Sequence, residues 1–190
     1  MFLIVGLGNP GERYEFNRHN IGYRIIDAFA SELGLGDWKK QGIYHNSEIL
    51  NVEHMGHKAH LMKPGTFMNN SGVAVHRYLN DKHLETENLW VIQDETEVPF
   101  GEVRVKFGGS SAGHNGINSI DQEVGSGYWR IRVGVGRPTN DQPLSDYVLS
   151  NFTAQEFEQL GKVIDQVVAY LIKSLEEGTI TSQTFNAKEN

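Results

Sequence analysis

The chain alternates short apolar runs with longer amphipathic segments, the pattern of strands and helices that follow one another. An aliphatic run over residues 2–7 predicts a buried first strand. Apolar residues then recur at helical spacing over about residues 21–33, where Asn20 can cap the helix and Gly34 can end it. The chain therefore opens with a strand that leads through a polar loop into a helix.

The middle of the chain predicts a hairpin, a second helix and two more strands. Apolar segments at about 43–53 and 58–63 flank a glycine-containing turn and predict the hairpin. A helix is expected over about residues 71–83, and strands are expected at 89–92 and 103–107.

The last third predicts two helices around one strand. Asn115 can cap the first helix, and residues 130–135 alternate as a strand does. Thr153 and Glu156 form a T-x-x-E capping box that opens a long amphipathic helix, which Gly178 ends.

This order of elements predicts an α/β fold, a three-layer sandwich with a mixed central sheet and helices on both faces. A length of 190 residues suits one domain. Because no linker divides the chain, we expect a single domain over residues 1–178, followed by a polar tail over residues 179–190 that is loosely held apart from Phe185.

Composition excludes several classes of protein. No apolar run approaches the ~20 residues of a membrane span. The apolar start lacks a basic leader and a small-residue cleavage site, so we expect a core strand there and not a signal peptide. The absence of cysteine excludes disulfides, thiolate nucleophiles and thiolate zinc sites, and we expect a cytoplasmic protein.

The formal net charge of -7 argues against tight binding to duplex nucleic acid. The charge is unevenly distributed, however, because basic residues outnumber acidic ones over residues 101–140. A weakly basic patch on an acidic body suits transient contact with a few phosphates.

Three glycine-flanked polar clusters each lie between a predicted strand and a predicted helix. Loops on that side of a sheet can meet in one crevice. The side chains that they would bring together are neutral amides and two histidines: Asn9, His19, Asn69, His114 and Asn115. Such amides hold ester or peptide groups by hydrogen bonding, so the set points towards acyl chemistry.

The first cluster, Gly6-Leu-Gly-Asn-Pro-Gly11, also matches the G-x-G-x-x-G pattern of dinucleotide-binding proteins. That pattern requires a helix to start at the third glycine, whereas residues 12–18 intervene here. Pro10 also removes a backbone donor from the would-be phosphate cradle. A nucleotide site is therefore disfavoured, and a glycine turn shaped only for packing stays open as an alternative.

His19 is the candidate general base. Asp94 follows an apolar strand, and a buried carboxylate there can fix the tautomer of the imidazole and stabilise its charged form. Asn69 and Asn115 can donate to an acyl oxygen, although a role in capping helices accounts for similar residues. We interpret His54, His57 and His60 as surface histidines and expect no metal site.

Several ordered motifs together resemble bacterial-type peptidyl-tRNA hydrolases over essentially the whole chain. The matching segments are Ile4-Val-Gly-Leu-Gly-Asn-Pro-Gly11, Tyr14, Arg18-His-Asn-Ile-Gly22, Pro64-Gly-Thr-Phe-Met-Asn-Asn-Ser-Gly72, Asp94-Glu95, Gly113-His-Asn-Gly116 and Arg130-Ile-Arg-Val-Gly-Val-Gly136. The resemblance implies a monomeric α/β hydrolase that needs no cofactor. Its substrate would be peptidyl-tRNA, and it would cleave the ester that joins the peptide to the 3′ ribose.

The resemblance also implies a role for individual residues. His19 matches the catalytic base, Asp94 the carboxylate that supports it, and Asn9 the residue that senses the blocked amino end of the acyl group. The expected substrate-binding residues are Asn69 and Asn115 at the acyl-tRNA end, Tyr14 and Phe67 lining the same site, and Lys106 and Arg132 against tRNA phosphate.

The chain departs from the family pattern at Asn70, at Gln93 and over residues 95–98, where Glu-Thr-Glu-Val stands. The last two departures flank Asp94 and bear on how it is held. A different class of function also stays open, namely an RNA- or nucleotide-binding module with this fold and no turnover.

Overall fold

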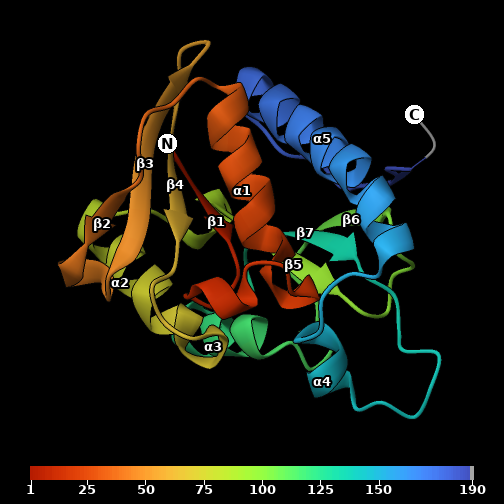
Figure 1. Ribbon diagram of the computed structural model, residues 1–190. Helices are drawn as coiled ribbons and strands as arrows, with labels where there is room; N and C mark the ends of the chain where they lie inside the picture. Colours follow the sequence, from red (N-terminus) through yellow and green to blue (C-terminus); the bar gives the residue numbers. More distant parts are fainter. Residues whose placement is uncertain (189–190) are drawn as a thin grey trace.

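The structure is a computed structural model that describes residues 1–188, and it contains one sheet in the order β2-β3-β4-β1-β5-β7-β6-β8 (Figure 1). The strands are β1 (Phe2–Gly6), β2 (Lys39–Gln41), β3 (Ser47–His54), β4 (His57–Lys63), β5 (Leu89–Glu95), β6 (Glu102–Phe107), β7 (Trp129–Gly134) and β8 (Gln183–Asn186). The helices are α1 (Ile21–Glu32), α2 (Ser71–Lys82), α3 (Asn115–Val124), α4 (Leu144–Val148) and α5 (Ala154–Glu177).

The four central strands, β4, β1, β5 and β7, run parallel, and the outer strands are antiparallel to their neighbours. Parallel strands are covered on both faces, which explains why β1 is apolar at consecutive positions. Ile4 faces one hydrophobic cluster, whereas Leu3 and Val5 face the other.

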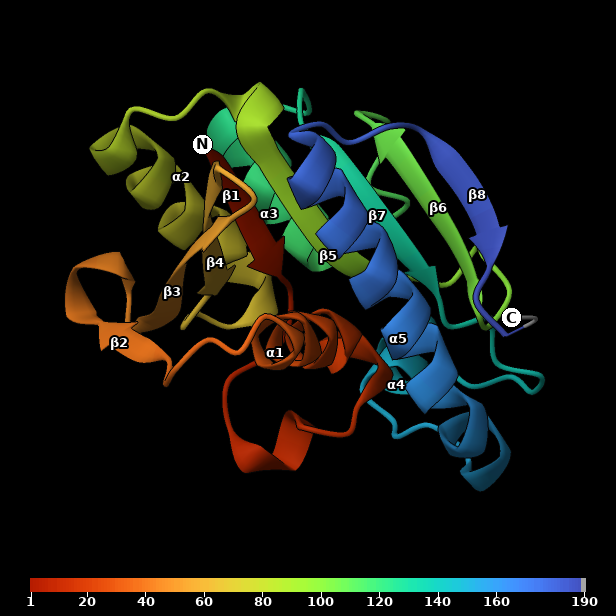
Figure 2. The ribbon, with the colours of Figure 1, turned by 90° about the horizontal axis from the view of Figure 1, so that it is seen from above.

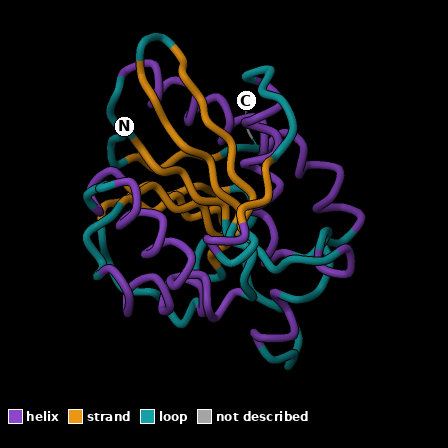
Figure 3. The backbone as a smooth tube through the Cα atoms, turned by 90° about the vertical axis from the view of Figure 1, so that its left-hand side faces the viewer, coloured by secondary structure: helices purple, strands orange, loops and turns teal. Residues whose placement is uncertain are grey.

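Helices cover both faces of the sheet, as the sequence predicts (Figure 2). α1 and α5 pack together on one face, and α2 and α3 pack together on the other. Seen from the side, the β3–β4 hairpin rises above the rest of the sheet (Figure 3). No helix in residues 1–188 is long and apolar enough to cross a membrane.

Glycines allow α1 to lie directly on the end of β1. A Cβ atom on Gly22 would lie 2.4 Å from the backbone nitrogen of Leu7 and 2.5 Å from the carbonyl oxygen of Ile92. A Cβ atom on Gly6 would lie 2.3 Å from the carbonyl oxygen of Gly22, and one on Gly8 would lie 2.7 Å from the Tyr23 ring. The first two glycines of the G-x-G-x-x-G pattern therefore serve helix packing, which favours the packing interpretation of this motif.

The capping box of α5 is confirmed, because Thr153 Oγ1 accepts from the backbone N–H of Glu156 and Glu156 Oε2 accepts from that of Thr153. Of the two other predicted caps, Asn20 holds the N-cap position of α1 without a capping hydrogen bond, and Asn115 was wrong. At α1, the side-chain oxygen of Asn20 accepts from the backbone N–H of Asn9 instead. At α3, the neighbouring His114 accepts the hydrogen bonds that Asn115 was expected to accept.

The expectation of a loosely held tail was wrong for Gln183–Asn186, which form β8 on the edge of the sheet. The ring of Phe185 packs 5.7 Å from that of Tyr170, and Ala187 is fully buried. Backbone pairing with β6 and these two apolar side chains together dock a mostly polar segment. Residues 189 and 190 of the expected tail lie outside the described part of the chain.

Candidate active site

His19 and Asp94 meet at the carboxyl end of the parallel strands. His19 lies in a short 3-10 helix (Arg18–Asn20) just before α1, and Asp94 is the next-to-last residue of β5. His19 Nδ1 lies 2.8 Å from Asp94 Oδ1, and the two residues are only 6% and 2% exposed. The predicted contact between base and carboxylate is therefore present in the structure.

A second histidine binds the same carboxylate oxygen. His114 Nε2 lies 2.9 Å from Asp94 Oδ1, while His114 Nδ1 accepts hydrogen bonds from the backbone N–H groups of Gly116 and Ile117 at 3.1 and 3.3 Å. Because a backbone N–H only donates, His114 Nδ1 must be unprotonated. The proton of His114 is then on Nε2 and is donated to Asp94.

This arrangement also determines the tautomer of His19. The Asp94 carboxylate accepts hydrogen bonds, so His19 contributes its Nδ1–H to it. The Nε2 atom of His19 is left with a free lone pair, which is the state that a general base requires.

Burial and charge act in opposite directions on this cluster. Burial by itself would raise the pKa of Asp94, but His19 and His114 outweigh it and hold that pKa well below its usual range. Burial by itself would lower the pKa of His19, but the charge of Asp94 and the hydrogen bond to it raise the pKa above 6.5.

The ligand atoms of His19, Asp94 and His114 lie within 4.8 Å of one another, which is also a spacing that can hold a metal ion. The hydrogen bonds do not suit that use. For His114 to offer Nε2 to a metal, its proton would have to move to Nδ1, where two backbone N–H groups point. The cluster therefore fits a hydrogen-bonded base better than a metal centre.

Asn9 and Asn20 lock the loop after β1. The backbone N–H of Asn9 donates to Asn20 Oδ1, and Asn20 Nδ2 donates to the carbonyl oxygen of Asn9, both at 2.9 Å. Asn9 Oδ1 accepts from the backbone N–H of Met68 at 2.8 Å. The side-chain oxygen of Asn9 thus links the first polar cluster to the second, and its NH₂ group makes no hydrogen bond within the described part of the chain.

The other predicted residues lie around this centre. Asn115 is exposed and lines a cavity of about 320 Å³ together with His19, Asp94 and His114. Asn69 is exposed and follows Met68 in a 3-10 helix. The rings of Tyr14 and Phe67 meet edge to face, with their centroids 6.3 Å apart. The described residues that line the 320 Å³ cavity do not include Asn9, Asn69, Tyr14 or Phe67.

Lys106 and Arg132 lie on the neighbouring strands β6 and β7. Both line a groove of about 560 Å³, which Arg104 also lines. Arg132 Nη2 donates to the carbonyl oxygen of Ser110 at 3.1 Å, and Lys106 is exposed. The structure therefore places these cations together, in a groove of their own.

Sequence reasoning missed the specific roles of His114 and Asn20. His114 was grouped with the polar side chains of the crevice but was given no role. The G-H-N-G cluster, at the start of a helix, was the available signal, because a histidine there can cap the helix with one nitrogen and still offer the other.

The comparisons with known proteins show the family of the chain. The family model for peptidyl-tRNA hydrolase matches residues 3–190. The chain belongs to this family. Peptidyl-tRNA hydrolases of Wolbachia sp. subsp. Drosophila simulans (strain wRi) and Bartonella henselae are each 44% identical to the chain. The first match covers 88% of this chain and 89% of the relative, and the second covers 91% and 90%.

Solved structures of peptidyl-tRNA hydrolases share the fold. The crystal structure of the enzyme from Acinetobacter baumannii is 31% identical to the chain, with a TM-score of 0.87, and the match covers 94% of this chain and 89% of that one. A complex of peptidyl-tRNA hydrolase with N-propanol is 33% identical, with a TM-score of 0.84 and the same coverage.

Two of the expected departures from the family pattern flank Asp94, and its carboxylate keeps the hydrogen bonds to His19 and His114. Gln93 is 1% exposed, and its Nε2 lies 3.4 Å from the carbonyl oxygen of Asp94. Thr96 and Glu97 line the 320 Å³ cavity, and Glu97 pairs with Arg137 there.

Proposed function

We propose that the protein hydrolyses the ester bond between an N-blocked peptide and the 3′ ribose of tRNA, and so releases free tRNA. One observation carries the proposal: a buried carboxylate orients two histidines and leaves Nε2 of His19 free. Membership of the family supplies the class of substrate. No cofactor is needed for this chemistry. We further propose that the protein is monomeric and cytoplasmic.

The reaction follows from the tautomers. His19 Nε2 takes a proton from a water molecule while the water oxygen attacks the ester carbonyl. Asp94 stabilises the imidazolium that forms. The tetrahedral intermediate then collapses, the bond to the 3′ oxygen breaks, and that oxygen takes the proton from His19. The products are a peptide carboxylic acid and a tRNA with a free 3′ hydroxyl.

The neutral amides have separate roles in this scheme. Asn69 and Asn115 donate to the carbonyl oxygen as negative charge develops on it. Asn9 bonds the blocked amino end of the acyl group, with Tyr14 and Phe67 at the edge of the same site. Lys106 and Arg132 contact tRNA phosphates.

Purified protein and N-acetyl-aminoacyl-tRNA provide the test, with release of free tRNA as the measurement. His19→Ala should lower kcat/KM by about 10²–10⁴-fold, the usual contribution of a general base. The matched control is His76→Ala, because His76 is an exposed histidine on α2 and should be dispensable. Binding of the substrate without release would instead support an RNA-binding module, and near-native turnover by His19→Ala would contradict the mechanism.

A further inference from the structure

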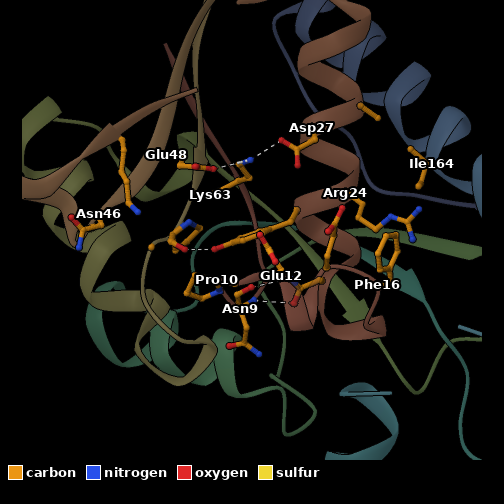
Figure 4. Close-up of a pocket in the computed structure, with 18 residues that line it drawn as sticks. Asn9, Pro10, Glu12, Phe16, Arg24, Asp27, Asn46, Glu48, Lys63 and Ile164 are labelled. Carbon is orange, nitrogen blue, oxygen red and sulfur yellow. Dashed lines mark hydrogen bonds and ion pairs between the residues drawn. The ribbon is translucent and has the colours of Figure 1, made fainter. Parts of the chain in front are cut away.

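A cavity of about 960 Å³ lies beside the segment that carries His19 (Figure 4), and none of the residues that line it also line the 320 Å³ cavity. We propose that it binds the residues of the peptide that precede the one esterified to tRNA. The inference rests on the proposed function and assigns a place to the part of the substrate that does not react. The cavity is bounded by the loop after β1, by α1 and by the β2, β3 and β4 strands.

The two cavities are lined by residues that are consecutive in the chain. His19 lines the smaller cavity, and Asn20 lines the larger one. Asn9, which is bonded to Asn20, also lines the larger cavity, and it is labelled at one end of it in Figure 4. An acyl chain whose carbonyl lies near His19 therefore reaches the larger cavity by passing the Asn9–Asn20 pair.

The sheet order gives the direction of the chain. Lys106 and Arg132, the proposed phosphate contacts, lie on β6 and β7, whereas the larger cavity lies beside β3 and β4 at the other side of β1. The ester joins the tRNA to the peptide, so a tRNA held over β6 and β7 leaves the peptide to extend towards β4 and β3.

The size and chemistry of the cavity suit a short peptide of varied sequence. Its volume is near the upper end of the ~300–1,000 Å³ range of pockets that hold drug-sized ligands. A buried lysine, Lys63, closes the end that lies opposite Asn9, and its Nζ lies 2.8 Å from both Asp27 Oδ1 and Glu48 Oε2 (Figure 4). The Arg24 guanidinium lies 5.8 Å from the Phe16 ring, so the wall also offers apolar and cationic surface.

Acidic residues slightly outnumber basic ones around the cavity. The acidic side chains are Glu12, Glu15, Asp27 and Glu48, and the basic ones are Arg24, Lys40 and Lys63. A wall with both signs of charge accepts many sequences, and its small negative excess favours basic over acidic peptide residues.

The kinetic test compares two substrates that share the tRNA and the esterified residue. One carries a single N-acetylated residue, and the other carries an N-acetylated tetrapeptide. The ratio of their kcat/KM values, long over short, should exceed one for the unaltered protein. Ala28→Phe introduces a ring into the cavity from α1. Because a methylene-sized change in a pocket is worth roughly 10–200-fold, this ratio should fall by at least about tenfold.

Arg77→Gln is the matched control, because Arg77 is exposed on α2, on the other face of the sheet. It should leave the ratio unchanged. Hydrolysis of both substrates with the same ratio in Ala28→Phe would overturn the peptide site and leave the proposed function intact. Failure of the unaltered protein to hydrolyse either substrate would contradict the proposed function itself.

Photocrosslinking tests the site without any variant. The probe is a tripeptidyl 3′-amino-adenosine, in which an amide replaces the ester, with benzoylphenylalanine as its first residue. Cross-links within residues 9–28 and 40–65 are expected, because these segments form most of the cavity wall. Cross-links confined to residues 95–97 and 137–148, around the smaller cavity, would overturn the proposal.

Discussion

At the scale of single residues, the site depends on one oxygen atom. Asp94 Oδ1 accepts from both His19 and His114, and the two imidazole rings lie 4.8 Å apart. His114 Nδ1 accepts from the two backbone N–H groups that it caps. His19 has no such restraint on Nε2, so it is the histidine that can change its charge during a reaction.

Asp94→Asn should move the pH dependence of activity. His19 acts as a base only when it is unprotonated, so kcat/KM of the unaltered protein should rise with pH through a midpoint above 6.5, since Asp94 raises the pKa of His19. The variant removes the charge and keeps the burial that lowers this pKa. The midpoint should therefore fall, and the plateau should drop by roughly 10²–10⁴-fold. A pH–rate profile with an unchanged midpoint would show that another group titrates.

Asn9→Asp should weaken the preference for N-blocked substrates. The variant keeps an oxygen that can accept from the backbone N–H of Met68, and it replaces the NH₂ group by a carboxylate oxygen. A free α-ammonium would then find a partner that the unaltered site does not offer. The measurement is the ratio of kcat/KM for N-acetyl-aminoacyl-tRNA to that for aminoacyl-tRNA. A ratio equal to that of the unaltered protein would place selectivity elsewhere.

At the scale of secondary-structure elements, the position of His19 depends on how closely α1 approaches the sheet. Gly22 is in the first turn of α1 and contacts the backbone of both β5 and the segment after β1. Arg18, on the other side of His19, is buried and donates to Glu156 Oε2 at 2.6 Å. The segment that carries His19 is therefore held between the sheet and the start of α5.

Gly22→Ala should destabilise the protein and reduce its activity. The added methyl group would lie within 2.6 Å of backbone atoms, which cannot move aside as a side-chain end can. Overpacking of this kind costs about 1–3 kcal/mol or more. The matched control is Gly161→Ala in α5, because a Cβ atom there would have no neighbouring atom of the described chain within 4 Å. It should stabilise the helix by roughly 0.5–1 kcal/mol.

Thermal unfolding of these two variants is the measurement. A fall in Tm for Gly22→Ala together with a small rise for Gly161→Ala is the expected result. Equal Tm values for both variants would mean that α1 can shift away from the sheet at little cost, and that His19 is positioned by other contacts.

At the scale of the whole molecule, charge is divided between regions. The formal net charge is -7, yet Arg104, Lys106 and Arg132 line one groove. Tertiary structure concentrates these cations, because β6 and β7 pair and place Arg104 opposite Arg132. An acidic molecule with one basic groove can hold a few phosphates and still release the product.

Lys106→Ala and Arg132→Ala should each raise KM for intact peptidyl-tRNA. Each should also reduce the slope of log affinity against log salt concentration by about 1, since each removes about one phosphate contact. A minimal substrate without the tRNA body should be hardly affected. The control is Lys162→Ala, which removes an exposed cation from α5. Equal losses on both substrates would place Lys106 and Arg132 in the chemistry or in the fold.

The sequence by itself determined the class of fold, and it made His19 the candidate base. The strand and helix patterns follow from the local spacing of apolar residues, and the capping box of α5 lies within four consecutive residues. Both features can therefore be predicted from the sequence alone. The motifs around His19, Asp94 and Asn9 were specific enough for the family resemblance, although no pattern showed that His19 and Asp94 touch.

Tertiary structure decided the remaining features, because each depends on contacts between residues that are distant along the chain. His114 binds Asp94 across 20 positions, and Asn20 binds the loop at Asn9 in place of capping its own helix. β8 pairs with β6, and its Phe185 packs on Tyr170 of α5. A hydrogen bond or an apolar contact goes to whichever partner the folded chain brings within reach, and local pattern alone contains no information about that partner.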